Sequence, residues 1–367
     1  MTEIIKIILI LPIFFILISA PFSSKSFTID NKILNYNLLV NCNILLIFSL
    51  LAIKIQEYQI IFLSILLIIY FNSFLNMIKK KVQIKFDKGL IFFFVTYLIL
   101  ACVIVNNLNL GWDAKYFYYT KSLFFHDGLN LTQLVNFEHS KWHPHLGSYL
   151  WAFFWSIPFF ENEYFGRLFY LFIYCFSIYY ITNNLNKNNL INYIFFFSII
   201  LITFKYERFS GLQEILIYSL LLISSRILCD LDLKNKVPSI LKILLIVNLM
   251  MWIKSEGLIY SCILIIILLL SRYPLLKEKL LITIFFALII FIKISVYSYY
   301  GFEINSQPYS INLSKLSDIN ELIYKITNMT MYIGYYSIKN ILFLLGTILL
   351  IYLNIDKKNK IKISVFN

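Results

Sequence analysis

The chain has 367 residues, of which 60% are hydrophobic and only 14% are charged, and its formal net charge is +13. Soluble domains are about 45–50% apolar and about 25% charged, and no soluble core buries so large a share of Ile, Leu and Phe. The composition therefore excludes a soluble globular protein and predicts an all-α, polytopic membrane protein.

Apolar segments of membrane length recur along the whole chain. A membrane-spanning helix needs roughly 20 apolar residues, and by that measure we expect about 11 spans. The first segment also resembles a secretory signal, but a proline at position 21, just after the expected cleavage point, favours an uncleaved helix. The segments are 4–20, 38–54, 58–77, 89–105, 164–182, 190–204, 209–228, 240–254, 257–271, 280–300 and 332–353.

Basic residues cluster in four connectors, which indicates the orientation of the spans, because cytoplasmic loops of membrane proteins are rich in Lys and Arg. Placing these clusters in the cytoplasm puts 106–163, 205–208, 254–256 and 301–331 on the extracytoplasmic side. It also requires an external N-terminus, unless the first span does not cross. This distribution of lysines argues against a nucleic-acid partner. The clusters comprise Lys79, Lys80, Lys81, Lys85 and Lys88; Lys234, Lys236 and Lys242; Arg272, Lys277 and Lys279; and Lys357, Lys358, Lys360 and Lys362.

The pattern divides the chain into three regions. Residues 1–88 hold the N-terminal membrane helices, and 89–275 form a membrane core with the external loop 106–163. Residues 276–367 hold the C-terminal membrane helices and a basic cytoplasmic tail.

The external loop is expected to carry interfacial helices. Segment 147–160 is apolar but only about 14 residues long, which suits a helix at the membrane interface better than a full crossing. Trp151 and Trp155 are four positions apart, so they would share one helix face at headgroup depth.

Charged side chains gather near the predicted extracytoplasmic ends of the spans. A charge at the bilayer centre costs roughly 2.5–3.5 kcal/mol, and less near the interface, so a polar cavity forms most easily at one interface. A transporter more often holds its ionisable groups near the midplane, where this chain has few. The gathered residues are Asp113, Glu138, His143, His145, Glu207, Arg208, Glu214, Lys254 and Glu256.

Asp113 follows an apolar span and lies at the start of the longest polar stretch of the chain. Two interpretations stay open. Asp113 is an exposed loop carboxylate, or it is a general base or a metal-binding acid at the membrane surface. As a base it would take a proton from an acceptor hydroxyl within hydrogen-bond distance, and partial burial would raise its pKa.

His143 and His145 flank Pro144 in a predicted turn. Two histidines at this spacing are weak evidence for a metal site, and contact with a phosphate or another substrate group is the favoured interpretation. A divalent metal stays open, and no other cofactor is predicted. The five cysteines form no C-x-x-C pair and are expected to be small buried apolar side chains.

Lys254 and Glu256 interrupt the apolar run from 240 to 270. A short solvated connector is one interpretation. The other is an anion site, because a lysine provides a compact point charge for a phosphate, with Glu256 holding the lysine or positioning an acceptor. Glu214 lies inside an apolar stretch, and Arg167 lies at the start of the span after the loop. Ionisable residues within membrane segments are functional candidates.

These segments, in this order, resemble motifs of the GT-C superfamily of membrane glycosyltransferases, which includes the protein O-mannosyltransferases and the aminoarabinose transferases of lipid A. The resemblance covers roughly 89–275 and depends on the order of the motifs, since none alone is specific. His145 replaces the second proline of a His-Pro-Pro-Leu-type turn, and Gln213 or Glu214 only loosely matches the acid of a Tyr-Ala-Asp segment. The matching motifs are Trp112-Asp113-Ala114-Lys115, Trp142-His143-Pro144-His145-Leu146-Gly147, Glu163-Tyr164-Phe165-Gly166-Arg167-Leu168 and Lys254-Ser255-Glu256-Gly257.

The resemblance implies an inverting sugar transfer from a polyprenyl-phosphate-linked donor to a lipid, glycan or protein acceptor, on the extracytoplasmic side of the cell membrane and among its lipids. It makes 89–275 the catalytic core and Asp113 the catalytic residue. Lys254, with Arg167 or a histidine, would contact the lipid phosphate. The implied substrate-binding residues are Trp112, Lys115, Lys121, Glu138, His143, His145, Arg167, Glu214, Lys254 and Glu256.

Other functions stay open. A polysaccharide polymerase or ligase is also polytopic, but such proteins more often carry arginines in late loops, and 301–331 contains none. A transporter or flippase for lipid-linked sugars would show inverted repeats and polar breaks near the midplane, and we find neither. An inactive membrane protein would tolerate replacement of Asp113.

Overall fold

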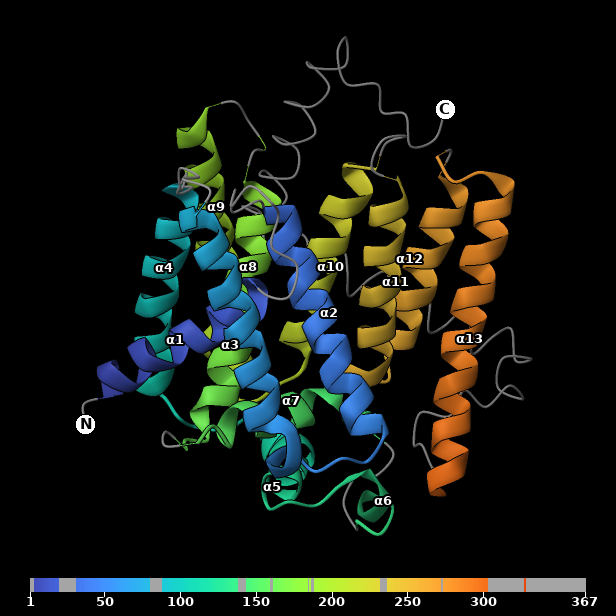
Figure 1. The fold of residues 1–367 in the computed structure, drawn as a ribbon, viewed down its shortest axis with the longest axis horizontal. Coiled ribbons are helices and arrows are strands. Elements are labelled where there is room, and N and C mark those ends of the chain that lie inside the picture. The colour runs from blue at the N-terminus through green and yellow to red at the C-terminus, as the bar shows by residue number, and fades with distance from the viewer. Residues whose placement is uncertain are drawn as a thin grey trace. The chain divides into compact units, whose positions relative to one another are not determined.

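The computed structural model of the chain describes residues 3–19, 31–79, 88–137, 143–158, 161–183, 185, 188–231, 236–271, 273–302 and 327. All regular elements within these ranges are helices (Figure 1). The chain forms two compact units, one of Met1–Leu269 with Tyr273–Phe302 and one of Leu270–Arg272 with Glu303–Asn367. The predicted span 332–353, the basic tail and most of 301–331 lie outside the described residues.

The long helices of the first unit agree with the apolar segments of the sequence. Each predicted span up to residue 300 corresponds to one helix, and 164–182 coincides with α8. The bounds are α1 (Glu3–Ser19), α2 (Asn31–Leu50), α3 (Ile55–Lys79), α4 (Lys88–Val105), α8 (Tyr164–Thr182), α9 (Asn189–Thr203), α10 (Glu214–Cys229), α11 (Lys236–Ile253), α12 (Gly257–Leu270) and α13 (Leu276–Tyr300).

The largest difference concerns α2, which begins at Asn31, seven residues before the predicted span 38–54. Its first half is rich in asparagine, which hydropathy alone counts against a buried helix. The side chains of Asn35, Asn37, Asn41 and Asn43 are buried. Asn41 donates to the Leu17 carbonyl and Asn43 donates to the Leu245 carbonyl at 3.3 Å, whereas the amide of Asn35 has no hydrogen-bond partner among the described residues. A buried polar group is tolerated when it is hydrogen-bonded.

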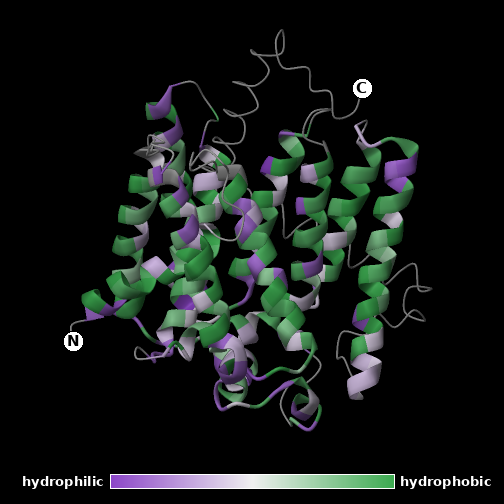
Figure 2. Cartoon of the chain, in the orientation of Figure 1, coloured by the Kyte–Doolittle hydropathy of each residue, from purple (hydrophilic) through white to green (hydrophobic). Residues whose placement is uncertain are grey.

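Four of the described helices are long and apolar enough to cross a membrane, namely those containing Ile33–Leu50, Ile55–Asn76, Tyr164–Thr182 and Leu276–Tyr300. Shorter apolar helices occupy Gly89–Val105, Asn189–Thr203, Val237–Ile253 and Gly257–Leu270. Apolar residues cover most of the length of these helices (Figure 2). The structure therefore agrees with a helical membrane protein, and the larger number of spans remains a prediction.

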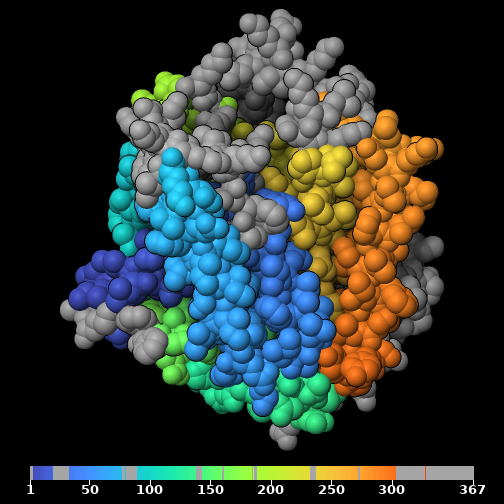
Figure 3. Space-filling model, in the orientation of Figure 1, coloured from blue at the N-terminus to red at the C-terminus, as the bar shows by residue number. Residues whose placement is uncertain are grey.

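Helices α3 and α13 lie on the outer face of the first unit in the view of Figure 3. Only 22% of the apolar window of α3 and 11% of that of α13 are buried. Exposed large apolar side chains such as Ile61 and Phe291 cover these helices. Such surfaces are stable against lipid and unfavourable in water.

Helix α8 is at the centre of the unit, since all but one of its side chains are buried. It packs against α4, α7 and α10, as expected for a helix that is apolar on every side. Gly166 permits the close crossing with α7, because a Cβ at this position would lie 2.6 Å from the Trp151 carbonyl oxygen.

Short helices fill the segment between α4 and α8. They are a π-helix over Ala114–Tyr119, α5 (Thr120–His126), α6 (Leu131–Leu134) and α7 (Leu146–Trp155). Helices α5 and α6 lie together at one end of the long helices, at the bottom of Figure 1. Further along the chain, a 3-10 helix over Tyr206–Phe209 joins α9 to α10.

The prediction of a helix at 147–160 is confirmed by α7 over Leu146–Trp155, and its depth in the membrane stays a prediction. Residues Leu146 to Phe154 are all buried. Trp151 donates from Nε1 to the Glu163 carbonyl oxygen at 3.0 Å and lies against α8, so this indole faces the protein and not lipid or water. The burial of α7 between α5, α8, α11 and α3 satisfies the indole N–H inside the protein, which a surface position would leave to water.

Candidate functional site

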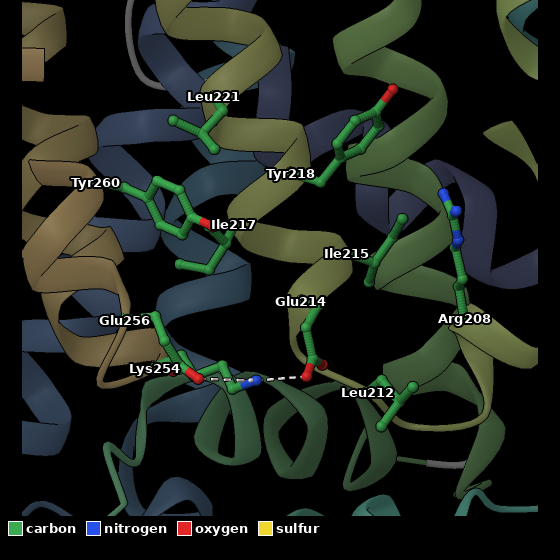
Figure 4. A pocket seen from close by; sticks show the side chains of 10 residues that line it. All are labelled: Arg208, Leu212, Glu214, Ile215, Ile217, Tyr218, Leu221, Lys254, Glu256 and Tyr260. Atoms are coloured by element: carbon green, nitrogen blue, oxygen red, sulfur yellow. Dashed lines mark hydrogen bonds and ion pairs between the residues drawn. The ribbon is translucent and has the colours of Figure 1, made fainter. Parts of the chain in front are cut away.

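A pocket of about 490 Å³ lies beside α10 and α12 and brings together residues from distant parts of the chain. In the view of Figure 4, Lys254, Glu214 and Glu256 lie together at one end, Arg208 lies on the opposite side from Lys254, and the apolar side chains continue along α10 to Leu221. The charged side chains are Arg208, Glu214, Lys254 and Glu256, and the others are Leu212, Ile215, Ile217, Tyr218, Leu221 and Tyr260.

Three predicted site residues form the charged centre of this pocket. The Lys254 ammonium is ion-paired with the Glu214 carboxylate and lies 3.5 Å from Glu256 Oε1. Burial by itself lowers the pKa of Lys254, but the hydrogen bonds and negative charges of Glu214 and Glu256 outweigh it and hold this pKa above its ordinary value. The lysine is therefore charged at neutral pH, with both carboxylates on its ammonium.

Gln213 fixes the elements that carry this centre. With its amide oriented so that both groups are satisfied, Gln213 donates to the Ile253 carbonyl oxygen at 2.6 Å and accepts from Ser148 Oγ at 3.0 Å and Ser148 N at 2.9 Å. These bonds join the start of α10, the end of α11 and the first turn of α7. Because Glu214 and Lys254 directly follow Gln213 and Ile253 in the chain, one buried amide sets the spacing of both charges.

Two glycines make the close packing around this amide possible. A Cβ at Gly147 would lie 2.3 Å from the Gln213 side chain. A Cβ at Gly257 would lie 1.8 Å from the Met250 carbonyl oxygen, so only glycine fits where the chain turns from α11 into α12. The Lys254–Gly257 motif thus has a structural reason for its last residue.

Asp113 is exposed at the start of the π-helix and is not among the residues that line the pocket, but the segment before it contacts the chain next to the pocket. The Gly111 N–H donates to the Ser210 carbonyl oxygen at 3.1 Å, and a Cβ on Gly111 would lie 4.0 Å from Leu212 Cδ2, which lines the pocket. On the other side of this contact, Gly211, with φ +95°, lies so close to the Ala114 side chain that a Cβ at Gly211 would crowd it. π-helical turns are rare and frequently occur at functional sites.

Lys121 and His143, two further predicted site residues, are connected by a hydrogen bond. Lys121 is fully buried, and its Nζ donates to the His143 carbonyl oxygen at 2.7 Å. Burial lowers the pKa of Lys121 to about 7. Burial, then the charge of Lys121, lower the pKa of His143 to about 4. The charges of Glu256 and Lys254 also act on His143, which places this imidazole within electrostatic range of the pocket centre.

His145 has a different environment from His143. Its Nε2 lies 2.9 Å from Ser49 Oγ, and its ring packs 5.7 Å from the Trp252 ring centroid. Burial, followed by the charges of Lys121 and Lys293, lowers the pKa of His145 to about 3. The neutral ring therefore joins α7 to α2 and α11 inside the protein.

Arg167 is buried away from the residues that line the pocket. Its Nη2 donates to Glu163 Oε2 at 2.8 Å, and its Nη1 donates to the Leu108 carbonyl oxygen at 3.3 Å. Burial raises the pKa of Glu163, and Arg167 opposes this shift. These contacts connect α8 to the turn that precedes Asp113. Within the described residues, Arg167 Nε and Glu163 Oε1 are buried without a hydrogen-bond partner.

The remaining predicted residues divide into exposed and undescribed ones. Trp112 and Lys115 are exposed on either side of Asp113, and the Trp112 ring packs against Tyr116 and Phe117. Glu138 and Trp142 lie outside the described residues.

The sequence analysis placed Arg208 among the charges near the helix ends but did not assign it to substrate binding. It also did not assign Tyr218 or Tyr260, which look like ordinary apolar-span residues. The position of Arg208 in the polar turn 205–208 was a usable signal, whereas the two tyrosines had none. In the described ranges, no three His, Cys, Asp or Glu side chains lie close enough together to hold a metal ion.

Comparison of the chain with protein-family models, with curated proteins and with solved structures gave no match.

Proposed function

We propose that the chain is an integral membrane glycosyltransferase of the GT-C type. In this proposal it transfers a sugar, with inversion, from a polyprenyl-phosphate-linked donor to an acceptor on the extracytoplasmic side of the cell membrane. Asp113 is the general base, and the proposal takes the helices of the chain to cross the membrane several times.

The observation that carries the proposal is the chemistry of the pocket. Its charged side chains, the cations Lys254 and Arg208 and the carboxylates Glu214 and Glu256, suit a phosphate and the hydroxyl groups of a sugar. Its apolar walls along α10 suit the hydrocarbon chain of a lipid carrier. Ligand pockets are generally apolar with a few polar groups that set orientation, and the lining of this pocket has that composition.

The position of Asp113 supports its role as the base. The carboxylate is exposed at the start of the π-helix, and the Gly111 N–H, two residues earlier, donates to the carbonyl oxygen of Ser210, which lies in the chain between the lining residues Arg208 and Leu212. In this proposal an acceptor reaches the donor from the aqueous side along this segment. The carboxylate takes the proton of an acceptor hydroxyl as the oxygen attacks the anomeric carbon. The bond from that carbon to the phosphate oxygen breaks, and the electron pair leaves on the polyprenyl phosphate.

Sugar transfer in membranes tests this proposal, with a panel of polyprenyl-phosphate sugars and the variant Asp113→Asn. Removal of a general base typically costs about 100-fold or more in rate, so transfer by the wild type should collapse in this variant. Asp127→Asn, an exposed acid further along the same segment, is the matched control and should keep full activity. Equal transfer by wild type and Asp113→Asn would remove Asp113 from the reaction.

Topology provides a separate test. Cysteines introduced at Lys115 and at Asn136 should react with membrane-impermeant reagents from the extracytoplasmic side. Labelling from the cytoplasmic side alone would contradict the proposed orientation and with it the lipid-linked donor.

A further inference from the structure

The pocket contains two cations and two carboxylates, but only one of the cations is paired with these carboxylates. Lys254 contacts both Glu214 and Glu256. Within the described part of the chain, Arg208 forms no ion pair, and its hydrogen bond runs from Nη1 to the Thr203 carbonyl oxygen at 3.0 Å. The positive charge of Arg208 is therefore not neutralised by the acids of its own pocket.

The guanidinium group also has unused donor capacity. Arginine offers five N–H donors in a planar fork, and the Thr203 carbonyl takes one of them. This fork matches two oxygens of a phosphate, which makes Arg–phosphate pairs strong and directional. Figure 4 shows Arg208 on the opposite side of the pocket from Lys254, with Glu214 between them in this view.

Electrostatics favours Arg208 over Lys254 as the anion-binding residue. A phosphate beside Lys254 would lie against the carboxylates of Glu214 and Glu256, and like charges at such distances repel. A phosphate beside Arg208 avoids most of this repulsion. We infer that Arg208 binds the phosphate group of the ligand, whereas Lys254 is a positioning residue that holds Glu214 and Glu256 in place.

The walls next to Arg208 indicate what the phosphate is attached to. Ile215, Tyr218 and Leu221 are three positions apart along α10, so they share one helix face, and all three line the pocket with Arg208. A phosphate at the end of a single apolar chain uses both the guanidinium and this face, whereas free phosphate uses the guanidinium alone. This inference rests on the proposed function, because it identifies which residue of that site holds the donor phosphate.

Equilibrium binding to the full chain in lipid nanodiscs tests the inference without any sugar transfer. The probes are radiolabelled geranylgeranyl phosphate, geranylgeraniol and inorganic phosphate. A charge-assisted hydrogen-bond pair contributes enough that Arg208→Gln should weaken binding of geranylgeranyl phosphate by about tenfold or more, and Arg208→Lys should lose less. Lys205→Gln is the matched control, since Lys205 is exposed in the same turn and does not line the pocket.

The outcomes separate the two sources of phosphate and the two proposals. If the wild type binds geranylgeranyl phosphate more tightly than inorganic phosphate, and both affinities depend on Arg208, the ligand is a lipid phosphate. If the two affinities are equal, the ligand at Arg208 is a free phosphate. Arg208→Gln binding within twofold of wild type, or a wild type that binds neither phosphate, overturns the inference. Arg208-dependent binding without transfer of any sugar leaves the anion site intact and removes the proposed function.

Arg208→Gln should also lower stability, because the Arg208 side chain satisfies the Thr203 carbonyl at the end of α9 and the variant loses this hydrogen bond. Thermal unfolding of each variant is therefore measured beside binding. A loss of binding in Arg208→Gln at an unchanged Tm, with partial recovery in Arg208→Lys, assigns the effect to the charge and its fork geometry. If Arg208→Lys recovers neither binding nor Tm, the loss of binding in Arg208→Gln comes from a disturbed end of α9, and the inference is overturned.

Discussion

Lys254 and Glu214 form an ion pair across the pocket although they are 40 positions apart in the chain. Both lie at helix ends, Lys254 after α11 and Glu214 at the start of α10, and the buried amide of Gln213 joins these two ends. The Lys254 side chain is 16% exposed and that of Glu214 is 52% exposed. Lys254 is thus held mostly inside the protein, whereas the Glu214 carboxylate can be reached by solvent or a ligand.

The charge balance of this pair should control the affinity for an anion. Lys254→Gln makes the pocket more negative and should weaken binding of geranylgeranyl phosphate, whereas Glu214→Gln should strengthen it. Each change should be about fivefold or less, because the groups are partly in water. Nanodisc binding measures both variants. If both variants bind geranylgeranyl phosphate more weakly, or both more tightly, the pair affects binding by positioning the pocket residues and not by its charge.

Gly257→Ala should destabilise the protein strongly. Its Cβ would lie 1.8 Å from the Met250 carbonyl oxygen, and a backbone atom cannot move aside without separating α11 from α12. Overpacking of this kind costs about 1–3 kcal/mol. Thermal unfolding in detergent measures the effect, with Ser255→Ala in the same connector as the control. Equal Tm values for the two variants would show that the turn adapts to a side chain.

Lys121 should make stability depend on pH. Burial lowers its pKa from 10.5 to about 7, so between these values the unfolded chain keeps a proton that the folded chain has released. The free energy of unfolding then rises with pH across this window. Below about pH 7 the folded protein keeps the buried charge, so the destabilisation by that charge is at its full size. The Tm of the wild type should increase from pH 7 to pH 9 more than the Tm of Lys121→Met.

The control for this measurement is Lys115→Met, since Lys115 is exposed about two turns earlier. Its pH profile should match that of the wild type. A Lys121→Met profile parallel to the wild type would show that Lys121 keeps its proton in the folded state throughout this range.

Arg167 and Glu163 should be strongly coupled in stability. Arg167→Met leaves the Glu163 carboxylate, 23% exposed, without its cation, and loss of one partner of a buried pair costs about 3–5 kcal/mol. The double variant Arg167→Met with Glu163→Gln should cost less than the sum of the two single changes. Denaturant unfolding of the full cycle measures the coupling.

Arg226→Met provides the comparison for this cycle. Arg226 pairs with Asp230 over the same sequence spacing but with both side chains more exposed, so its loss should cost about 1 kcal/mol or less. Equal losses for Arg226→Met and Arg167→Met would mean that burial does not strengthen the pair at α8.

Most helices could be predicted because hydropathy reports local composition. The span 164–182 coincides with α8 because an apolar run, interrupted by Arg167 near its start, is bounded by Glu163 and Asn183. The start of α2 was missed because Asn31, Asn35 and Asn37 are polar and lower the hydropathy of the segment before residue 38, although Asn35 and Asn37 are buried in the structure.

The candidate site was predicted in part for a related reason. Glu214, Lys254 and Glu256 lie in short connectors or at helix ends, and charges in an apolar chain must gather at such places, so their meeting in one pocket agrees with the sequence analysis. The position of Arg167 inside an apolar span was a sequence signal, whereas the burial of Lys121 followed none, since a buried cation and an exposed one in a polar stretch look the same in a sequence.

The sequence by itself determined an apolar, all-helical chain, the positions of its long helices up to residue 300 and the connectors that hold its charges. Only the tertiary structure decided that α7 is buried, that Lys254 is held by two carboxylates and that Arg208 lines the same pocket without a carboxylate partner among the described residues. Local composition decides whether a segment is helical and apolar. The partner of a charged side chain depends instead on which helix ends pack together, and here contacts such as those of Gln213 with Ser148 and Ile253 set that packing.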